Sequence, residues 1–200
     1  MKIISSKSIK NTFQYTWWIY LLTPVLLAPL FYWSFSIYHR PTSFEKVEIF
    51  VGADVVDKSF TEKLKDKVVS DSLRLVGVSS LSPEQPRYKE KLSVVGINNC
   101  DLLILPKESV DMFEDTSEYF VELDTELSSY SSNGFYEKED KKYGYDVSSS
   151  WLNETYINFK SDTSYYLLIN VSSKNAGKYY KEGNHNENAL KVTKAILEGI

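Results

Sequence analysis

Side chains able to act as nucleophiles or metal ligands are few in this sequence of 200 residues. Cys100 is the one cysteine, and His39 and His185 are the two histidines. None of the three has the spacing to another that a zinc site requires, and a lone His185 in a polar loop sets no geometry for serine hydrolysis. Cys100 precedes an apolar run, and we interpret it as a half-buried small residue rather than a reactive thiol. We therefore expect no enzyme activity, no metal and no other cofactor.

Charged and glycine-containing patterns give no stronger indication of chemistry. Glu137, Glu139 and Asp140 lie among lysines, which is typical of a solvated loop. The chain contains neither of the glycine-rich motifs that cradle phosphates, so nucleotide binding is not indicated. Residues 40–200 carry 20 Lys and Arg against 27 Asp and Glu, a net charge of −7. This acidic balance argues against a nucleic-acid partner, which would require a basic face.

The strongest signal is an uncharged stretch near the N-terminus. No charged residue occurs between Asn11 and Tyr38, and aromatic residues gather at both ends of its apolar centre. A helix over residues 17–38 would span roughly 30 Å, the thickness of the hydrocarbon core of a membrane. We therefore predict a transmembrane helix, a signal anchor, whose partner is membrane lipid. The alternatives are a cleaved signal peptide, which the bulky aromatic exit disfavours, and a buried core helix.

The lysines of the N-terminus predict how this segment is oriented. Lys2, Lys7 and Lys10 precede it with no acidic residue among them, whereas both signs of charge follow it. The positive-inside rule then places residues 1–16 in the cytoplasm as an N-terminal tip. Residues 39–45 form a linker, and residues 46–200 form an extracytoplasmic domain. The predicted localisation is the cell membrane, with a single pass.

The positions of apolar residues predict alternating strands and helices in this domain. Lys46–Val51 alternates as a strand does, Ser59 and Glu62 match a capping box for a helix to about Ser70, and Leu73–Val78 is a second strand. This unit predicts a parallel crossover. The remaining expected elements are a short strand at Lys91–Val95, a buried strand at Asp101–Leu105, a helical turn at Ser109–Phe113, strands at Tyr119–Leu123, Tyr143–Val147 and Tyr165–Val171, and a closing helix at Glu187–Leu197. The predicted fold class is α/β, one three-layer-like domain with a mostly parallel or mixed sheet.

Several short motifs occur in a familiar order along this domain: Lys91-Leu92, Asp101–Leu105, Phe120–Asp124, Tyr143–Val147, Tyr165–Asn170, Ser172–Gly177 and Asn188–Val192. The order resembles the first lobe of extracellular solute-binding proteins of ABC importers, which have the type II periplasmic-binding-protein fold. Members of that family hold a ligand between two lobes. Here only about 15 residues separate the Tyr165 strand from the final helix, which leaves no room for a second lobe. The resemblance therefore implies a single lobe.

The resemblance also implies where a ligand would bind. Family contacts lie just after the strand that begins with Asp and on the strand that contains Tyr-Gly, which correspond here to Pro106, Lys107, Tyr145 and Asp146. Two nearby aromatic residues, Tyr143 and Trp151, have the ring faces that stack on sugars. The alternative is that these aromatic side chains pack on the sheet.

Three hypotheses of function follow. The first is a non-enzymatic, membrane-anchored binding or interaction domain, similar to a solute-binding protein, which presents a ligand or docks on another membrane protein such as a transporter. The second is a structural or assembly protein that scaffolds a membrane complex and binds no small molecule. The third, an envelope hydrolase, has the least support. The sequence leaves open whether there is a small-molecule ligand.

Overall fold

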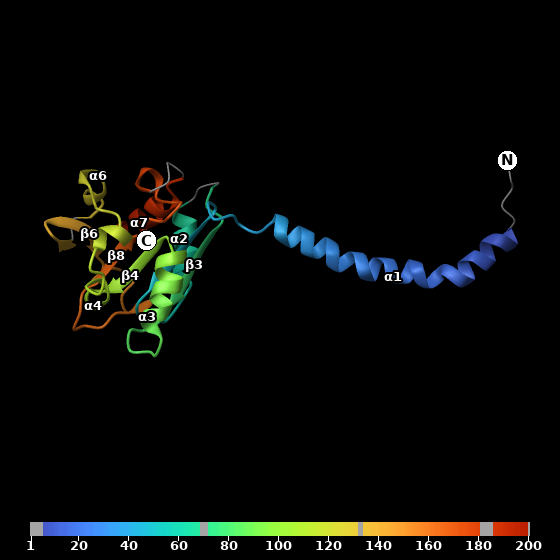
Figure 1. Ribbon diagram of the computed structural model, residues 1–200, viewed down its shortest axis with the longest axis horizontal. Helices are drawn as coiled ribbons and strands as arrows, with labels where there is room; N and C mark the ends of the chain where they lie inside the picture. The colour runs from blue at the N-terminus through green and yellow to red at the C-terminus, as the bar shows by residue number, and fades with distance from the viewer. Residues whose placement is uncertain (1–5, 69–71, 132–133, 181–185, 200) are drawn as a thin grey trace. The chain divides into compact units, whose positions relative to one another are not determined.

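The computed structural model describes residues 6–68, 72–131, 134–180 and 186–199 (Figure 1). The chain divides into two compact units, Met1–Arg40 and Pro41–Ile200. The first unit contains one long helix, and the second contains the whole α/β domain.

The first unit is helix α1 (Ser6–Tyr38), which includes Pro24 and Pro29. Its segment Thr16–Tyr38 is long and apolar enough to cross a membrane, and none of it is buried in the protein. A signal sequence has the same appearance, so this helix is consistent with either of them. The helix begins within the predicted N-terminal tip, of which residues 1–5 lie outside the described residues.

The second unit is built on a six-stranded mixed sheet with the order β3-β1-β4-β8-β6-β5 (Figure 1). The strands are β1 (Lys46–Val51), β3 (Leu75–Ser80), β4 (Leu102–Pro106), β5 (Phe135–Lys138), β6 (Lys141–Asp146) and β8 (Tyr165–Ile169). Both β3 and β4 pair with β1 in parallel, whereas the other pairs are antiparallel. The α/β class and the parallel crossover from β1 to β3 are thereby confirmed.

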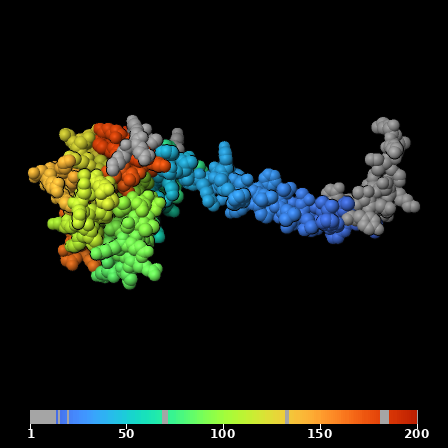
Figure 2. Space-filling view, in the orientation of Figure 1, coloured from blue at the N-terminus to red at the C-terminus, as the bar shows by residue number. Residues whose placement is uncertain are grey.

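Two apolar clusters cover the two faces of the sheet. Alternation along β1 sends Ile49 to one face and Phe50 to the other, where each side chain is completely buried. Helices α2 (Phe60–Lys67) and α7 (Asn188–Glu198) pack on the Ile49 face. The Phe50 face is covered by α3 (Tyr88–Lys91), the π-helix η1 (Leu92–Ile97) and α4 (Lys107–Val110). The domain is thus a helix–sheet–helix sandwich, and residues around 80–130, green to yellow in Figure 2, form much of the surface seen there.

Short elements complete the domain: β2 (Asp54–Val55) paired with β7 (Ile157–Asn158), α5 (Thr116–Tyr119), α6 (Thr125–Ser128) and the 3-10 helix η2 (Gly177–Tyr179). The predicted strand at Tyr119–Leu123 is reduced to a single bridge between Phe120 and Asn170.

Two local predictions were wrong. Lys91–Val95 is helical rather than a strand, because Leu92 and Gly96 are buried four residues apart while Val94 is exposed. The capping box at Ser59 does not form, because Ser59 already has helical backbone angles and donates its hydroxyl to Asp57. Helix α2 ends at Lys67, and the predicted end near Ser70 lies outside the described residues.

Candidate functional site

The residues predicted to bind a ligand do not meet at one site. Pro106 is buried at the end of β4, and Lys107 is exposed at the start of α4. Asp146 ends β6, where its Oδ1 accepts hydrogen bonds from the backbone N–H and hydroxyl of Ser148. Trp151 is half-buried and donates its indole N–H to a carbonyl of α7 at 2.9 Å. Trp151 therefore packs against α7, in agreement with the alternative prediction that the aromatic side chains pack within the domain.

The two tyrosines of β6 lie on opposite faces of the sheet because the strand contains a bulge. Tyr145 pairs with Phe135, but the register then shifts, so that Tyr143 is an extra residue in β6. The Tyr145 ring is 0% exposed on the Ile49 face, and its hydroxyl donates to the carbonyl of Leu127 at 2.9 Å. Tyr143 is 4% exposed and belongs to the opposite cluster. Neither ring offers a face on which a sugar could stack.

Tyr143 instead lines a polar hollow of about 280 Å³, which we call the Tyr143 hollow. The side chains come from the segment that enters α5 and from the hairpin between β5 and β6. The complete lining is Glu114, Asp115, Thr116, Ser117, Lys138, Glu139, Lys141 and Tyr143. Thus one of the six predicted residues lies at a hollow, and the other seven lining residues were missed by sequence reasoning.

The Tyr143 hydroxyl is the unusual group in this hollow. Among the residues that the structure describes, it has no hydrogen-bond partner; the ring is almost wholly buried, and the hydroxyl itself is accessible from the hollow. Burial raises the pKa of Tyr143, so the hydroxyl is neutral at ordinary pH and can both donate and accept. The neighbouring Thr116 is 2% exposed, and its Oγ1 also lacks a partner within the described part of the chain. Buried polar groups normally have partners, so the Thr116 hydroxyl is the group here that a bound water or ligand would satisfy.

The charged groups around the hollow are partly engaged already. Lys138 donates to the carbonyls of Phe113 and Glu114 at 2.7 and 2.8 Å, which fastens the hairpin to the segment before α5. Lys141 donates to Glu122 at 2.8 Å, a bond that raises the lysine pKa. Asp115 accepts from the hydroxyl and N–H of Ser117, which holds the carboxyl pKa below its usual value.

The hairpin turn that borders the hollow is strained. Glu139 and Asp140 have φ angles of 54° and 61°, in the left-handed region. Two such residues in a two-residue hairpin form the turn that favours Asn, Asp and Gly; Asp140 suits this turn, whereas Glu139 does not. Strain of this type often occurs at functional sites. In this turn it presents the Glu139 carboxylate at the hollow.

A second polar hollow, also about 280 Å³, surrounds Asp101 at the opposite end of β4 from Pro106. Its Oδ2 accepts from the N–H of Glu48 at 2.9 Å, and its Oδ1 accepts from Ser173 Oγ at 2.6 Å and Asn175 Nδ2 at 2.9 Å. Burial raises the pKa of Asp101 despite these bonds. Because all three bonds join separate segments, we call this group the Asp101 clasp and assign it a structural role.

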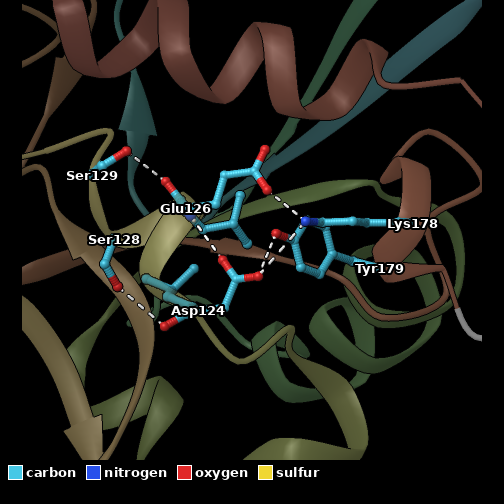
Figure 3. A network of polar contacts seen from close by, with 8 residues as sticks. Asp124, Glu126, Ser128, Ser129, Lys178 and Tyr179 are labelled. Atoms are coloured by element: carbon cyan, nitrogen blue, oxygen red, sulfur yellow. Dashed lines mark hydrogen bonds and ion pairs between the residues drawn. The ribbon is translucent and has the colours of Figure 1, made fainter.

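A third group of polar contacts joins α6 to η2 (Figure 3). Lys178 lies 3.9 Å from Asp124 and 2.5 Å from Glu126, and the Tyr179 hydroxyl donates to Asp124 at 2.8 Å. Asp124 also accepts from the N–H of Leu127, which caps α6 and lowers the carboxyl pKa. These side chains are largely exposed, so the network stabilises little and serves to position α6.

The residues first considered for catalysis show no assembled centre. Cys100 is buried, and burial raises its pKa to about 12, so it stays a thiol. His39 lies just after α1, and His185 is outside the described residues. No group of three or more His, Cys, Asp or Glu within the described ranges is arranged to hold a metal ion.

Comparisons with known proteins found no relative. No family model matches the chain, and neither a curated protein nor a solved structure is significantly similar to it.

Proposed function

We propose that this chain is a single-pass membrane protein whose extracytoplasmic domain, residues 46–200, binds a small polar solute in the Tyr143 hollow. The proposal follows the sequence resemblance to one lobe of a solute-binding protein but moves the site away from Pro106 and Lys107. The segment Thr16–Tyr38, which is long and apolar enough to cross a membrane, supports the membrane anchor. The lysines before that helix support a cytoplasmic N-terminus.

The observation that carries the binding proposal is a pair of hydroxyls at the hollow, the buried Thr116 Oγ1 and the accessible Tyr143 hydroxyl, neither of which has a partner in the described structure. An unpaired buried hydroxyl costs about 1–3 kcal/mol, and a ligand that pairs with it recovers this free energy. The lining adds carboxylates from Glu114, Asp115 and Glu139 as acceptors, and ammonium groups from Lys138 and Lys141 as donors. This mixed set suits a solute with several hydroxyl or amino groups rather than an anion.

The volume of the hollow limits the size of that solute. About 280 Å³ is at or below the lower end of pockets that hold drug-sized molecules, roughly 300–1,000 Å³. A monosaccharide, a polyol or an amino acid is therefore the class of ligand expected, and the contacts are hydrogen bonds rather than ring stacking.

Thermal unfolding of the full chain in detergent micelles tests this proposal. A panel of monosaccharides, polyols and amino acids is added in millimolar excess, and a ligand present at 100 times its Kd should stabilise the protein by about 2.7 kcal/mol. Tyr143→Phe, which removes only the hydroxyl, should reduce the affinity about tenfold. Tyr179→Phe, which removes a hydroxyl outside the hollow, is the matched control and should leave the affinity unchanged. A panel in which no compound stabilises the protein, or an equal response of wild type and Tyr143→Phe, contradicts the proposal.

A second candidate function, a structural protein that assembles a membrane complex, is favoured by a different observation. One edge of the sheet, strand β3, has backbone groups with no partner among the described residues. Such an edge is a surface for pairing with another chain.

A further inference from the structure

Strand β3 forms one margin of the sheet, and its pairing with β1 fixes which of its backbone groups point outward. The N–H groups of Leu75 and Leu81 donate to carbonyls on the β1 side at 3.2 and 3.1 Å. In a parallel pair, every second residue bonds the same neighbour, so the odd-numbered residues face β1. The N–H and C=O groups of Val76 and Val78 therefore face away from the sheet, and no described residue bonds them.

The two edges of the sheet differ in how they are protected. Strand β5, at the far edge, contains Glu137 and Lys138 and has a bulged partner, both of which hinder pairing with a foreign strand. Strand β3 has the sequence LVGVSS, which contains no charge and no proline. Leu75 at its start is 43% exposed. The protein thus protects one edge and leaves the other able to pair.

We propose that two copies of this chain associate by antiparallel pairing of their β3 strands about a twofold axis at Gly77. In this register, Val76 lies opposite Val78 of the partner subunit, and Gly77 lies opposite Gly77 of the partner subunit. The two valine pairs form four backbone hydrogen bonds, and the six strands of each domain become one twelve-stranded sheet.

The ends of β3 identify a second copy as the partner. The same register places Arg74 opposite Ser80 of the partner subunit, where the next bond would run from the Arg74 N–H to the Ser80 carbonyl. The Arg74 N–H already donates to the Glu45 carbonyl at 2.7 Å, and the Ser80 carbonyl already accepts from Lys91 Nζ at 3.0 Å. One of the two bonds of this end pair, from the Arg74 N–H to the Ser80 carbonyl, is thus replaced within each domain, and the other, from the Ser80 N–H to the Arg74 carbonyl, can still form between the copies.

The charges beside this seam are also balanced within each copy. Glu48, whose carboxylate leans over Gly77, pairs with Lys46 at 3.3 Å, and Arg74 pairs with Glu45 at 3.8 Å. A strand from an unrelated protein would satisfy the backbone groups equally well, but its own flanking groups would not match these ends. This inference is independent of ligand binding in the Tyr143 hollow.

Disulfide crosslinking of the full chain in isolated membranes tests the register. Leu75 lies opposite Ser79 of the partner subunit in a non-hydrogen-bonded pair, with a Cα separation of about 4.5 Å, within disulfide range. Mild oxidation of the double variant Leu75→Cys/Ser79→Cys should therefore give a covalent dimer. Each single variant should not, since its two cysteines are roughly 13 Å apart. The unaltered chain, with Cys100 buried, is the control.

A second measurement follows the dimer in detergent by mass photometry. Val78→Pro removes the outward N–H without disturbing the β1 pairing, and it should raise the dissociation constant of the dimer at least about tenfold. Val78→Thr keeps the N–H and is the matched control. Crosslinking by the single variants, no crosslinking by the double variant, a monomeric wild type, or an unchanged dissociation constant in a folded Val78→Pro protein would overturn the proposal.

Discussion

Replacing Asp101 by alanine removes the carboxylate that joins three segments of the domain. Its two oxygens accept hydrogen bonds from the Glu48 N–H, the Ser173 hydroxyl and the Asn175 amide. After the replacement, Asn175 still has two backbone carbonyls as acceptors, and Ser173 still accepts from the Asn175 N–H. The Glu48 N–H and the Ser173 hydroxyl proton are then the donors left without an acceptor.

The magnitude follows from these bonds. Each hydrogen bond to a charged group contributes about 1.5–3 kcal/mol, and an orphaned buried donor costs about 1–3 kcal/mol. The unfavourable burial of the carboxylate offsets part of this loss. We expect Asp101→Ala to lower the free energy of unfolding by about 3 kcal/mol, and Asp101→Asn, which keeps one acceptor oxygen, by about 1–2 kcal/mol. For a domain of this size, 1 kcal/mol shifts Tm by about 2–4 °C.

Thermal unfolding of the full chain in detergent, followed by near-ultraviolet circular dichroism of the buried tyrosines, measures the effect. The expected decrease in Tm is about 6–12 °C for Asp101→Ala and clearly smaller for Asp101→Asn. Glu84→Ala, at an exposed ion pair with Lys160, is the control and should change Tm by less than about 2 °C. A change in Tm of less than about 2 °C for Asp101→Ala as well would show that the Asp101 clasp is not a stabilising element.

Three further predictions concern other parts of the chain. Burial raises the folded-state pKa of Asp101 above its ordinary value of 3.8, so the folded state keeps a proton that the unfolded state loses. The free energy of unfolding of the wild type, relative to that of Asp101→Asn, should therefore fall as pH rises from about 4. An increase of this difference with pH, measured by unfolding at a series of pH values, would refute the prediction. Tyr145→Phe removes one of the hydrogen bonds to the Leu127 carbonyl, which keeps its bond from the Tyr130 N–H. The substitution should lower the free energy of unfolding by about 1 kcal/mol in the same thermal assay, and an unchanged value would contradict this. Leu26→Arg places a charge in the middle of α1 at a cost of about 2.5–3.5 kcal/mol, so the fraction of chain that resists alkaline extraction from membranes should fall; full retention would contradict a spanning helix.

Strands with continuous apolar runs could be predicted from the sequence. The runs around Leu103 and Leu168 are buried on both faces, so every residue of the run is apolar and the pattern is unmistakable. The short run at Lys91–Val95 misled us, because five residues are too few to distinguish a strand from one turn of a helix. The helical spacing of Leu92 and Gly96 becomes visible only when the window is extended.

The candidate site was less predictable because it depends on a bulge. Regular alternation places Tyr143 and Tyr145 on the same face, and only the pairing with β5 reveals the extra residue. Of the acidic residues 137, 139 and 140, Glu139 borders the site, yet in the sequence alone this run looks like any solvated loop. The Asp101 clasp was equally hidden, since Asp101 bonds residues more than 70 positions away in the chain.

The position of β8 in the sheet determines when the domain can be completed during synthesis. This strand lies between β4 and β6, but it ends only at Ile169, roughly 60 residues after β4. At about 5–20 residues per second, the ribosome needs roughly 3–12 s to make that interval. Throughout it, the inner edge of β4 has no native neighbour, and the same is true of β6 once that strand has been made. The nascent domain is therefore open to mispairing with other chains until only its last fifth remains to be translated, so strand order sets the interval during which its central strands are unprotected.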